Sequence, residues 1–488
     1  MHSQRIVRGT AAILGIAVFC IATFDTAAAA AHGTTNVRDF GAAGDGEADD
    51  TAAIRQAIAE SETGLVVFPR GDYRITETIE IDLAQTGRIG LTGSGGTGRV
   101  VMAGSGPAFR FVGHHAGTAG PASFEASVWQ RERMPQVRNL EILGSHPEAD
   151  GLAFTGTMQA IVQGVLIREV RHGIHLTERN RNFIADSLHV YNCRGVGIYF
   201  DHVNLHQVNV TGSHISYCKG GGIKVVGSEI RNLQITGNDI EYNYDQEAEE
   251  SADVWIDSRE GTVREGTIAS NTIQAVPSPS GANVRFVGPQ PPVGRGAVGM
   301  WTISGNLIGN QEVNIHLTNA EGITVTGNHV YTARQQTILV EASRNIVISS
   351  NAFEQSHGFG RDFRNGITLR ETRGVVLTGN VITDAGTGSP EAGGAVELFG
   401  CEETLVASNQ IFEPRYRGIY VEGGRNALIT ANQVLDRAAE PRMRTAIEVR
   451  DGVRGAVLRD NMISEGSEGG IVAPDDACVS GTAAAVID

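Results

Sequence analysis

Short runs in which apolar and polar residues alternate recur along most of the chain. From residue 233 onward one phrase returns many times, with an alternating run, an asparagine and a second short run, as in W-T-I-S-G-N-L-I (301–308) and V-V-L-T-G-N-V-I (375–382). Alternation with a period of two indicates β-strands, whereas the apolar positions of an amphipathic helix repeat about every 3.6 residues. Each copy of the phrase therefore predicts two short strands that flank a tight turn.

The asparagines of this phrase lie 22 to 35 residues apart, so the basic unit has 22 or 23 residues and longer intervals contain insertions. They are Asn238, Asn271, Asn306, Asn328, Asn351, Asn380, Asn409, Asn432 and Asn461. Each unit also holds a third alternating run. Three short strands cannot bury an apolar face alone, but stacked units pair each strand with its equivalent at about 4.8 Å. A stacked asparagine can then satisfy buried backbone groups above and below it.

This repeat predicts an all-β fold, a single-stranded parallel β-helix with three strands per coil and roughly 10–12 coils. The 62 glycines suit the many tight turns that such a coil needs. Leucine-rich repeats have a different sequence signature.

The front of the chain carries a family resemblance. N-V-R-D-F-G-A-A-G-D-G-E-A-D-D-T-A-A-I-R-Q-A-I (36–58) and G-L-V-V-F-P-R-G-D-Y-R-I (64–75) resemble the opening of the pectate-lyase-like superfamily, which includes rhamnogalacturonase-like and epimerase-like proteins. The resemblance implies a right-handed β-helix whose open end is capped by a short helix over residues 51–60. We expect Asp49 and Asp50 to serve as its N-cap and first-turn charge. Because one fold carries many functions, the resemblance names no reaction.

Residues 1–30 have the pattern of a secretory signal peptide, with a basic start, a short apolar run and several alanines. We therefore expect an exported protein, periplasmic or extracellular. Residues 31–105 would form the cap and first coils, residues 106–475 the repeat domain, and residues 476–488 a tail. No later segment is long and apolar enough for a membrane helix, so we expect no membrane insertion.

The net charge of −16 makes the chain acidic. An acidic protein repels the phosphates of nucleic acid, and we expect no nucleic-acid partner. Only two of the 39 basic residues are lysines, Lys219 and Lys224, and both lie within one coil.

Four cysteines follow the leader, namely Cys193, Cys218, Cys401 and Cys478. An exported protein permits disulfides without requiring them. Cys193 and Cys218 fall at equivalent positions of neighbouring coils, so a disulfide and a buried thiol ladder both remain open.

The third strand of each unit presents an unusual outer face. In strands such as G-I-K-V-V (222–226) and D-V-W-I-D (253–257), the second and fourth residues are apolar and face inward, so the third and fifth face solvent. The third positions of successive coils are His175, Tyr199, Lys224, Trp255, Arg285, His316, Leu339, Thr368, Glu397 and Tyr420. We interpret this face as a groove for an extended anionic polysaccharide.

Three insertions lie in the turns that lead into these strands, at residues 244–252, 357–365 and 385–393. Loops along one edge of a rigid stack are a usual place for binding specificity. We therefore expect the groove to be elaborated on this edge.

The groove residues suit β-elimination of a uronic acid. A base takes the proton next to the carboxylate, and lysine can do so when burial lowers its pKa, whereas arginine stays protonated. The candidate catalytic residues are Lys224 or Tyr199 as base, Arg285 as carboxylate clamp, His175 as acid, and Asp201 and Asp257 beside them. The candidate substrate-binding residues are Trp255 as a sugar-stacking platform, His316, and Lys219 with Arg194 as a basic rim.

Other interpretations of the same residues stay open. Asp201 and Asp257 stand two coils apart, about 9.6 Å, at the upper end of the roughly 6.5–9.5 Å carboxyl separation of inverting glycoside hydrolases. They could instead pair with Lys224, or bind Ca²⁺ together with the acidic loop around Asp245. C5-epimerisation shares the first step of the lyase reaction, and a glycan-binding protein without catalysis is the alternative of another class.

Overall fold

The computed structural model describes residues 33–118, 120, 122–290, 297–356 and 363–485. The predicted signal peptide, residues 1–30, lies outside the described residues. The chain from Thr34 onward forms one compact unit. Among the described helices, none combines the length and the apolar character that crossing a bilayer requires.

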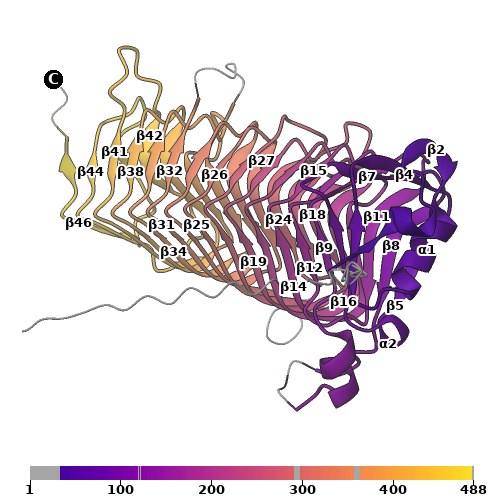
Figure 1. Ribbon diagram of the computed structural model, residues 1–488. Helices are drawn as coiled ribbons and strands as arrows, with labels where there is room; N and C mark the ends of the chain where they lie inside the picture. The colour runs from indigo at the N-terminus through magenta and orange to yellow at the C-terminus, as the bar shows by residue number, and fades with distance from the viewer. Residues whose placement is uncertain (1–32, 119, 121, 291–296, 357–362, 486–488) are drawn as a thin grey trace, which may run out of the picture. The chain divides into compact units, whose positions relative to one another are not determined.

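This unit is a stack of about 17 parallel coils with little helix (Figure 1). One coil consists of β18 (Gly221–Val226), β19 (Glu229–Thr236) and β20 (Asp239–Glu241), and each strand pairs in parallel with its equivalent one coil further on. The prediction of an all-β parallel β-helix with three strands per coil is confirmed. The expected 10–12 coils were too few, because the coils before residue 233 lack the asparagine phrase.

The repeated asparagines form a continuous ladder inside the stack. The side-chain oxygen of Asn271 accepts hydrogen bonds from the backbone N–H of Asn238 at 2.9 Å and from its Nδ2 at 3.0 Å. Asn238 Nδ2 also donates to the Val210 carbonyl at 3.0 Å. The same contacts link each asparagine of the phrase to the next, up to Asn461. The ladder thus satisfies backbone groups that burial would otherwise leave unpaired.

The predicted capping helix is present as α1 (Thr51–Ala59). Asp49 caps its first turn, since its Oδ1 accepts the Thr51 N–H at 3.0 Å. Asp50 has another task, because its carboxylate accepts the N–H groups of Ala43 at 2.7 Å and Gly44 at 3.0 Å. Asp50 thus occupies the N-cap position, but its side chain makes no capping hydrogen bond and instead braces the glycine-rich turn before the helix.

The four cysteines are free thiols. Cys193, Cys218 and Cys401 are buried, and Cys478 is exposed. Hydrogen bonding to Cys218, together with burial, raises the pKa of Cys193 well above its ordinary value. Cys193 and Cys218 are therefore a buried thiol pair in the stack.

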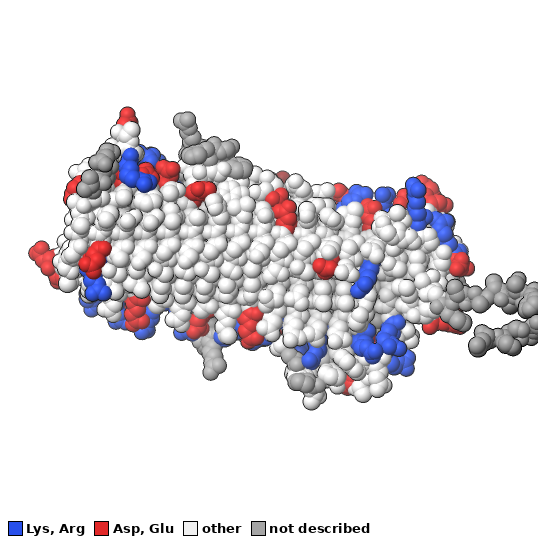
Figure 2. All heavy atoms as spheres, turned by 60° about the vertical axis from the view of Figure 1, so that its left-hand side comes forward, with Lys and Arg blue, Asp and Glu red and all other residues white. Residues whose placement is uncertain are grey.

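Charged side chains are unevenly spread over the surface. On the long side of the molecule that Figure 2 shows, they are sparse over the middle and gather near the upper and lower edges. On this side, charged groups that meet over the strands are therefore few.

Candidate functional site

The predicted groove face is one continuous column of paired strands. Tyr199 pairs in register with Lys224, Lys224 with Trp255, and Trp255 with Arg285, so the predicted order of side chains along the stack is confirmed. The strands that carry the column, here called the groove strands, are β14 (Ile174–Asp186), β16 (Val196–Thr211), β18, β21 (Ala252–Asp257), β24 (Ala282–Val287), β27 (Val313–Thr318), β30 (Gln336–Glu341), β33 (Ile367–Arg370), β36 (Val396–Phe399) and β39 (Arg417–Glu422).

The middle of this column does not face open solvent as predicted. Trp255 is 8% exposed and Arg285 only 4%. Arg285 Nη1 donates to Glu250 of the adjoining loop at 3.0 Å, and its Nη2 donates to the Ser280 carbonyl. Strand alternation predicts the direction of a side chain, but not the loops that fold over it. Arg285 is therefore no free carboxylate clamp.

Trp255 forms the centre of a cation stack. Lys224 Nζ lies 3.9 Å from the centre of its ring, and Arg285 Cζ lies 5.5 Å from it. Such cation–π contacts hold the two charges in place. Because its ring is buried and contacted by both cations, the role of a sugar-stacking platform predicted for Trp255 is not supported by this geometry.

Next to this stack lies a cluster of acid–base groups, here called the histidine–tyrosine cluster, made of His172, His175, Tyr199, Asp201 and His202. His175 Nε2 lies 3.0 Å from Asp201 Oδ2, and His202 Nδ1 lies 2.7 Å from Asp201 Oδ1. The rings of His175 and Tyr199 stack at 5.1 Å with an angle of 7° between their planes. The three predicted residues His175, Tyr199 and Asp201 thus do meet.

Burial sets the protonation of this cluster. Burial, and then the charge of Asp201 and a hydrogen bond to it, raises the pKa of Tyr199 to about 12. Burial lowers the pKa of His172 to about 4. Burial alone would raise the pKa of Asp201, but hydrogen bonds from His202 and His175 hold it below its ordinary value. Tyr199 therefore keeps its proton at neutral pH, while Asp201 is ionised.

Lys224 follows Tyr199 in the next coil of the column. Burial lowers the pKa of Lys224, against the opposing charges of Asp257 and Glu250. Among the described residues, its ammonium has no hydrogen bond or ion pair to a carboxylate. Asp257 is instead held by Arg259, whose Nε donates to Oδ1 at 3.0 Å. The alternative in which Asp201 and Asp257 simply pair with Lys224 is therefore wrong.

The remaining predicted residues lie apart from this centre. Arg194 donates to the carbonyls of His146 and Pro147 at 2.7 and 2.9 Å, so it braces a turn. Lys219 is exposed on the turn before β18. His316 stands in the column three coils beyond Lys224, with its Nε2 at 2.9 Å from Glu341 Oε2.

The carboxylates proposed as calcium ligands do not converge. Asp201 is engaged by two histidines, Asp257 by Arg259, and the Asp245 carboxylate by the N–H of Glu247 at 3.0 Å. Within the described ranges, three or more His, Cys, Asp or Glu side chains are nowhere grouped as metal ligands. These residues therefore do not fit a calcium site.

The sequence interpretation missed a cavity on the groove face. Here called the arginine pocket, it has a volume of about 760 Å³ and lies over β33 and β36. Its charged lining residues are Glu312, Arg334, Arg364, Arg370, Glu397 and Arg415. Arg370 and Glu397 were visible in the aligned strands, but the other arginines come from turns, whose folding the alternation does not predict.

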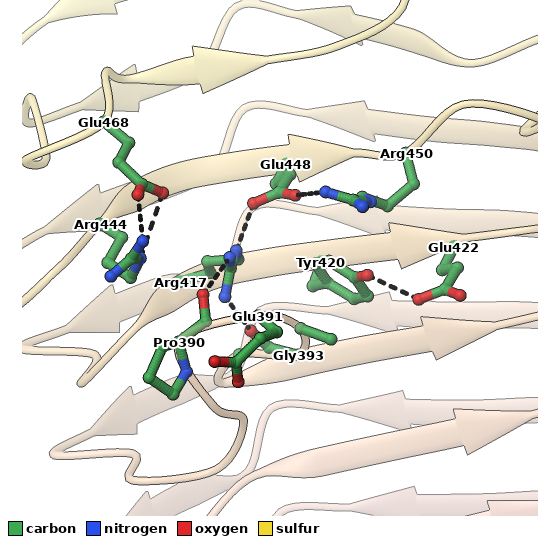
Figure 3. A network of polar contacts seen from close by, with 12 residues as sticks. Pro390, Glu391, Gly393, Arg417, Tyr420, Glu422, Arg444, Glu448, Arg450 and Glu468 are labelled. Carbon is green, nitrogen blue, oxygen red and sulfur yellow. Dashed lines mark hydrogen bonds and ion pairs between the residues drawn. The ribbon is translucent and has the colours of Figure 1, made fainter.

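One wall of the arginine pocket is the loop over residues 385–393, and Arg417 holds it. Its guanidinium donates to the carbonyls of Ser389 and Pro390, each at 3.0 Å, and pairs with the buried Glu448 (Figure 3). Glu448 also pairs with Arg450 at 2.9 Å, so the loss of Glu448, more than that of Arg417, would leave a buried charge uncompensated. The loop is therefore fixed to the stack, and the pocket is preformed.

The arginine pocket carries an excess of positive charge. Arg334 Nη1 lies 3.6 Å from Glu312, but Arg364, Arg370 and Arg415 make no ion pair with any described residue. At the pocket floor, burial raises the pKa of Glu397, although the Thr368 hydroxyl donates to it at 2.6 Å. Guanidinium groups in this arrangement favour an anionic, planar group such as a carboxylate.

Comparison with known proteins identifies the family. The model described as "Right handed beta helix region" matches residues 128–273, 250–388 and 313–480, which together cover well over half of the chain. The chain belongs to the right-handed β-helix family. In this β-helix, residues 34–120 also match the model "Rhamnogalacturonase A/epimerase, pectate lyase-like". The predicted superfamily is thus confirmed.

Individual relatives of this β-helix are distant. Mannuronan C5-epimerase AlgE3 of Azotobacter vinelandii is 52% identical over 44 residues, which are 8% of this chain and 2% of that protein. The chain thus spans only a small part of the length of this relative. The pre-mature bacteriophage phi29 gene product 12 is 13% identical with a TM-score of 0.51, over 91% of this chain and 56% of its own. The Dettilon tailspike protein is 16% identical with a TM-score of 0.45, over 75% and 68% of the two chains.

Proposed function

We propose that this β-helix is an exported enzyme that binds an acidic, uronate-containing polysaccharide along the groove strands and cleaves it by β-elimination. The proposal rests on one arrangement of side chains. His175 contacts both Tyr199 and Asp201, and Lys224, whose pKa is lowered, lies on the next strand. The arginine pocket on the same face supports an anionic substrate.

In this reaction, Lys224 in its neutral form takes the C5 proton next to the uronate carboxylate. The electron pair forms a C4–C5 double bond, and the C4–oxygen bond breaks. Tyr199, one coil away at about 4.8 Å, donates its phenolic proton to the departing oxygen. His175, oriented by Asp201, positions the sugar that reacts. The raised pKa of Tyr199 suits a general acid. Of the two candidates for the base, Lys224 and Tyr199, we therefore assign Lys224.

The inverting hydrolase is less well supported by the same geometry. Its general acid must hold a proton at working pH, which requires a raised pKa. The pKa of Asp201 is instead lowered, and Asp257 lies against Arg259. Neither carboxyl group is therefore suited to protonate a glycosidic oxygen.

C5-epimerisation is the second candidate, and the short match to a mannuronan C5-epimerase favours it. It begins with the same removal of the C5 proton. The intermediate is then reprotonated from the opposite face, so no bond to oxygen breaks. A protein that binds the glycan without reacting remains the non-enzymatic alternative.

Product analysis separates these functions. The protein would be incubated with polymannuronate, polygalacturonate and a glycosaminoglycan. The proposal predicts new ultraviolet absorbance from unsaturated uronate ends on one of these polymers. Inverted C5 centres in the NMR spectrum, without that absorbance, would establish the epimerase. Reducing ends without unsaturation, or binding without any product, would refute the proposal.

A further inference from the structure

Two tyrosines on successive coils form an exposed stack beside the groove. The rings of Tyr217 and Tyr242 lie parallel, with centres 5.7 Å apart and an angle of 10° between their planes. Tyr217 is 55% exposed, so its ring is accessible to a ligand. The core of the β-helix does not use these rings.

The backbone at both positions makes the choice of tyrosine more notable. Tyr217 and Tyr242 have φ angles of 60° and 55°, a left-handed conformation that bulky residues rarely adopt. The same turn position is filled in other coils by polar residues with φ between 52° and 63°, namely Glu169, Asn192, Asn310, Thr332, Asp384 and Glu413. Each of them, like the two tyrosines, donates its backbone N–H to the next coil. The turn thus accepts several residue types, so local folding does not require tyrosine there.

The stacked rings form part of a cavity of about 340 Å³, at the lower end of the roughly 300–1,000 Å³ of ligand sites. Its lining is Tyr217, Lys219, Tyr242, Tyr244, Asp245, Gln246 and Glu247. The loop that closes it is anchored, since Gln246 Nε2 donates to the Pro277 carbonyl at 3.1 Å and Ser251 Oγ accepts from the Asp245 N–H at 3.2 Å. Aromatic faces and hydrogen-bonding side chains thus meet in one preformed site.

This combination fits a pyranose ring. The C–H face of a sugar packs on an aromatic ring, and the hydroxyl groups around it need both donors and acceptors. The lining contains one lysine, Lys219, and two carboxylates, Asp245 and Glu247, so the site lacks the excess of positive charge that the arginine pocket has. An uncharged sugar suits it better than a uronate.

The position of the site indicates which part of a polysaccharide it receives. The tyrosines lie in the turns that lead into β18 and β21, the strands of Lys224 and Trp255. Lys224 is three residues into β18, about 10 Å to the side of that turn. A polymer that runs along the stack through the groove therefore passes beside the tyrosines and not over them.

We propose that Tyr217 and Tyr242 form a subsite for an uncharged sugar that branches from the acidic polysaccharide in the groove. This inference rests on the proposed function in one respect, namely that the groove binds the backbone of an acidic polysaccharide. It narrows the substrate class to branched acidic polysaccharides with neutral side-chain sugars.

The test compares two polymers by calorimetry, an unbranched polygalacturonate and an acidic polysaccharide of the same backbone with neutral galactose or glucose branches. The wild-type protein should bind the branched polymer more tightly. The double variant Tyr217→Asn/Tyr242→Asn should lose this preference, with roughly a 10-fold weaker affinity for the branched polymer, unchanged affinity for the unbranched one and an unchanged or higher melting temperature. Tyr217→Phe/Tyr242→Phe, which keeps the rings, should retain the preference.

Three results would overturn the subsite. One is equal affinity of the wild-type protein for both polymers, and another is an equal loss of both affinities in the asparagine double variant. The third is a lower melting temperature of that variant, which would make the stack a packing feature. Because the readout is binding, a failure of the subsite is distinguishable from a failure of the β-elimination proposal, which is measured by product.

Discussion

The two ends of the groove face differ in how their charges are satisfied. At the histidine–tyrosine cluster, Asp201 contacts His175 and His202, and the groups set one another's protonation. At the arginine pocket, six coils beyond Lys224 and thus about 29 Å away, three guanidinium groups lack a carboxylate partner among the described residues. Both regions stand on the same kind of strand.

This difference suggests a division of work between the two regions, in which the histidine–tyrosine cluster carries out the reaction and the arginine pocket binds the same polymer. Groups that hold and move protons must be tuned by neighbours, as they are around Tyr199. Groups that bind a carboxylate should keep an uncompensated charge, as Arg364 and Arg370 do. An extended polysaccharide can contact both regions at once, so reaction and binding can be altered separately.

The largest effect is expected at Lys224. Lys224→Met removes the base and should lower kcat by about 10²- to 10⁴-fold while KM changes little. Lys224→Arg is the matched control, because it keeps the positive charge over Trp255 but cannot release a proton. Steady-state kinetics of both variants test whether Lys224 is the base. Full activity of the arginine variant would mean that Lys224 acts only as a charge.

A smaller effect of the opposite kind is expected at the arginine pocket. The double variant Arg364→Gln/Arg370→Gln should raise KM by roughly 10- to 100-fold with kcat nearly unchanged, since charged hydrogen bonds contribute about 1.5–3 kcal/mol. The salt dependence of KM should also become weaker. Arg373→Gln, on an exposed pair with Glu403, serves as control. A fall in kcat with constant KM would contradict the division of work.

The third effect is on stability and not on activity, and it arises on β21, two coils beyond the strand of Tyr199. Asp253, fully buried in β21, has a pKa that burial raises to about 8, although Asn243 and Asn283 donate to it. Between its ordinary value of 3.8 and about 8, the unfolded chain loses a proton that the folded protein retains, so stability falls as pH rises through this window.

The variant Asp253→Asn should remove this pH dependence and be the more stable protein above about pH 8, with a difference of at most about 1.4 kcal/mol for each pH unit crossed. Asn283 Nδ2 faces the Asp253 carboxylate, so the new amide gains a partner when the side-chain amide of Asn283 turns over and presents its Oδ1, which has no hydrogen-bond partner among the described residues. Urea unfolding from about pH 5 to about pH 9 measures the effect. Parallel pH curves for both proteins would show that Asp253 is ionised when folded.

How far the sequence predicts this protein differs between strands and turns. The strict alternation along G-I-K-V-V predicted the inward face of β18 and the place of Lys224 beside Trp255 in the column, because side chains of a strand alternate and equivalent strands pair. It did not predict that the ammonium stacks on the ring. The Asn ladder followed from its regular spacing. The same alignment predicted that His175 and Tyr199 are neighbours in the column, but not that His175 contacts Asp201.

The turns could not be predicted in this way. The burial of Arg285 depends on Glu250 and Ser280, which belong to irregular segments of different length in each coil. Arg334 and Arg415 of the arginine pocket lie in such segments, and Tyr217 of the tyrosine stack also lies in a turn. Because insertions have no period, their residues are placed only by the folded chain.

The central claim, that the groove removes the C5 proton of a uronate, is tested most directly in heavy water. The protein would be incubated in D₂O with the uronate polymer that it binds, and the C5 positions of the recovered sugars would be analysed by NMR and mass spectrometry. We expect either unsaturated ends or deuterium at C5, and neither with Lys224→Met. A polymer that is bound, or even hydrolysed, while every C5 proton is retained and no unsaturated end forms would contradict the claim.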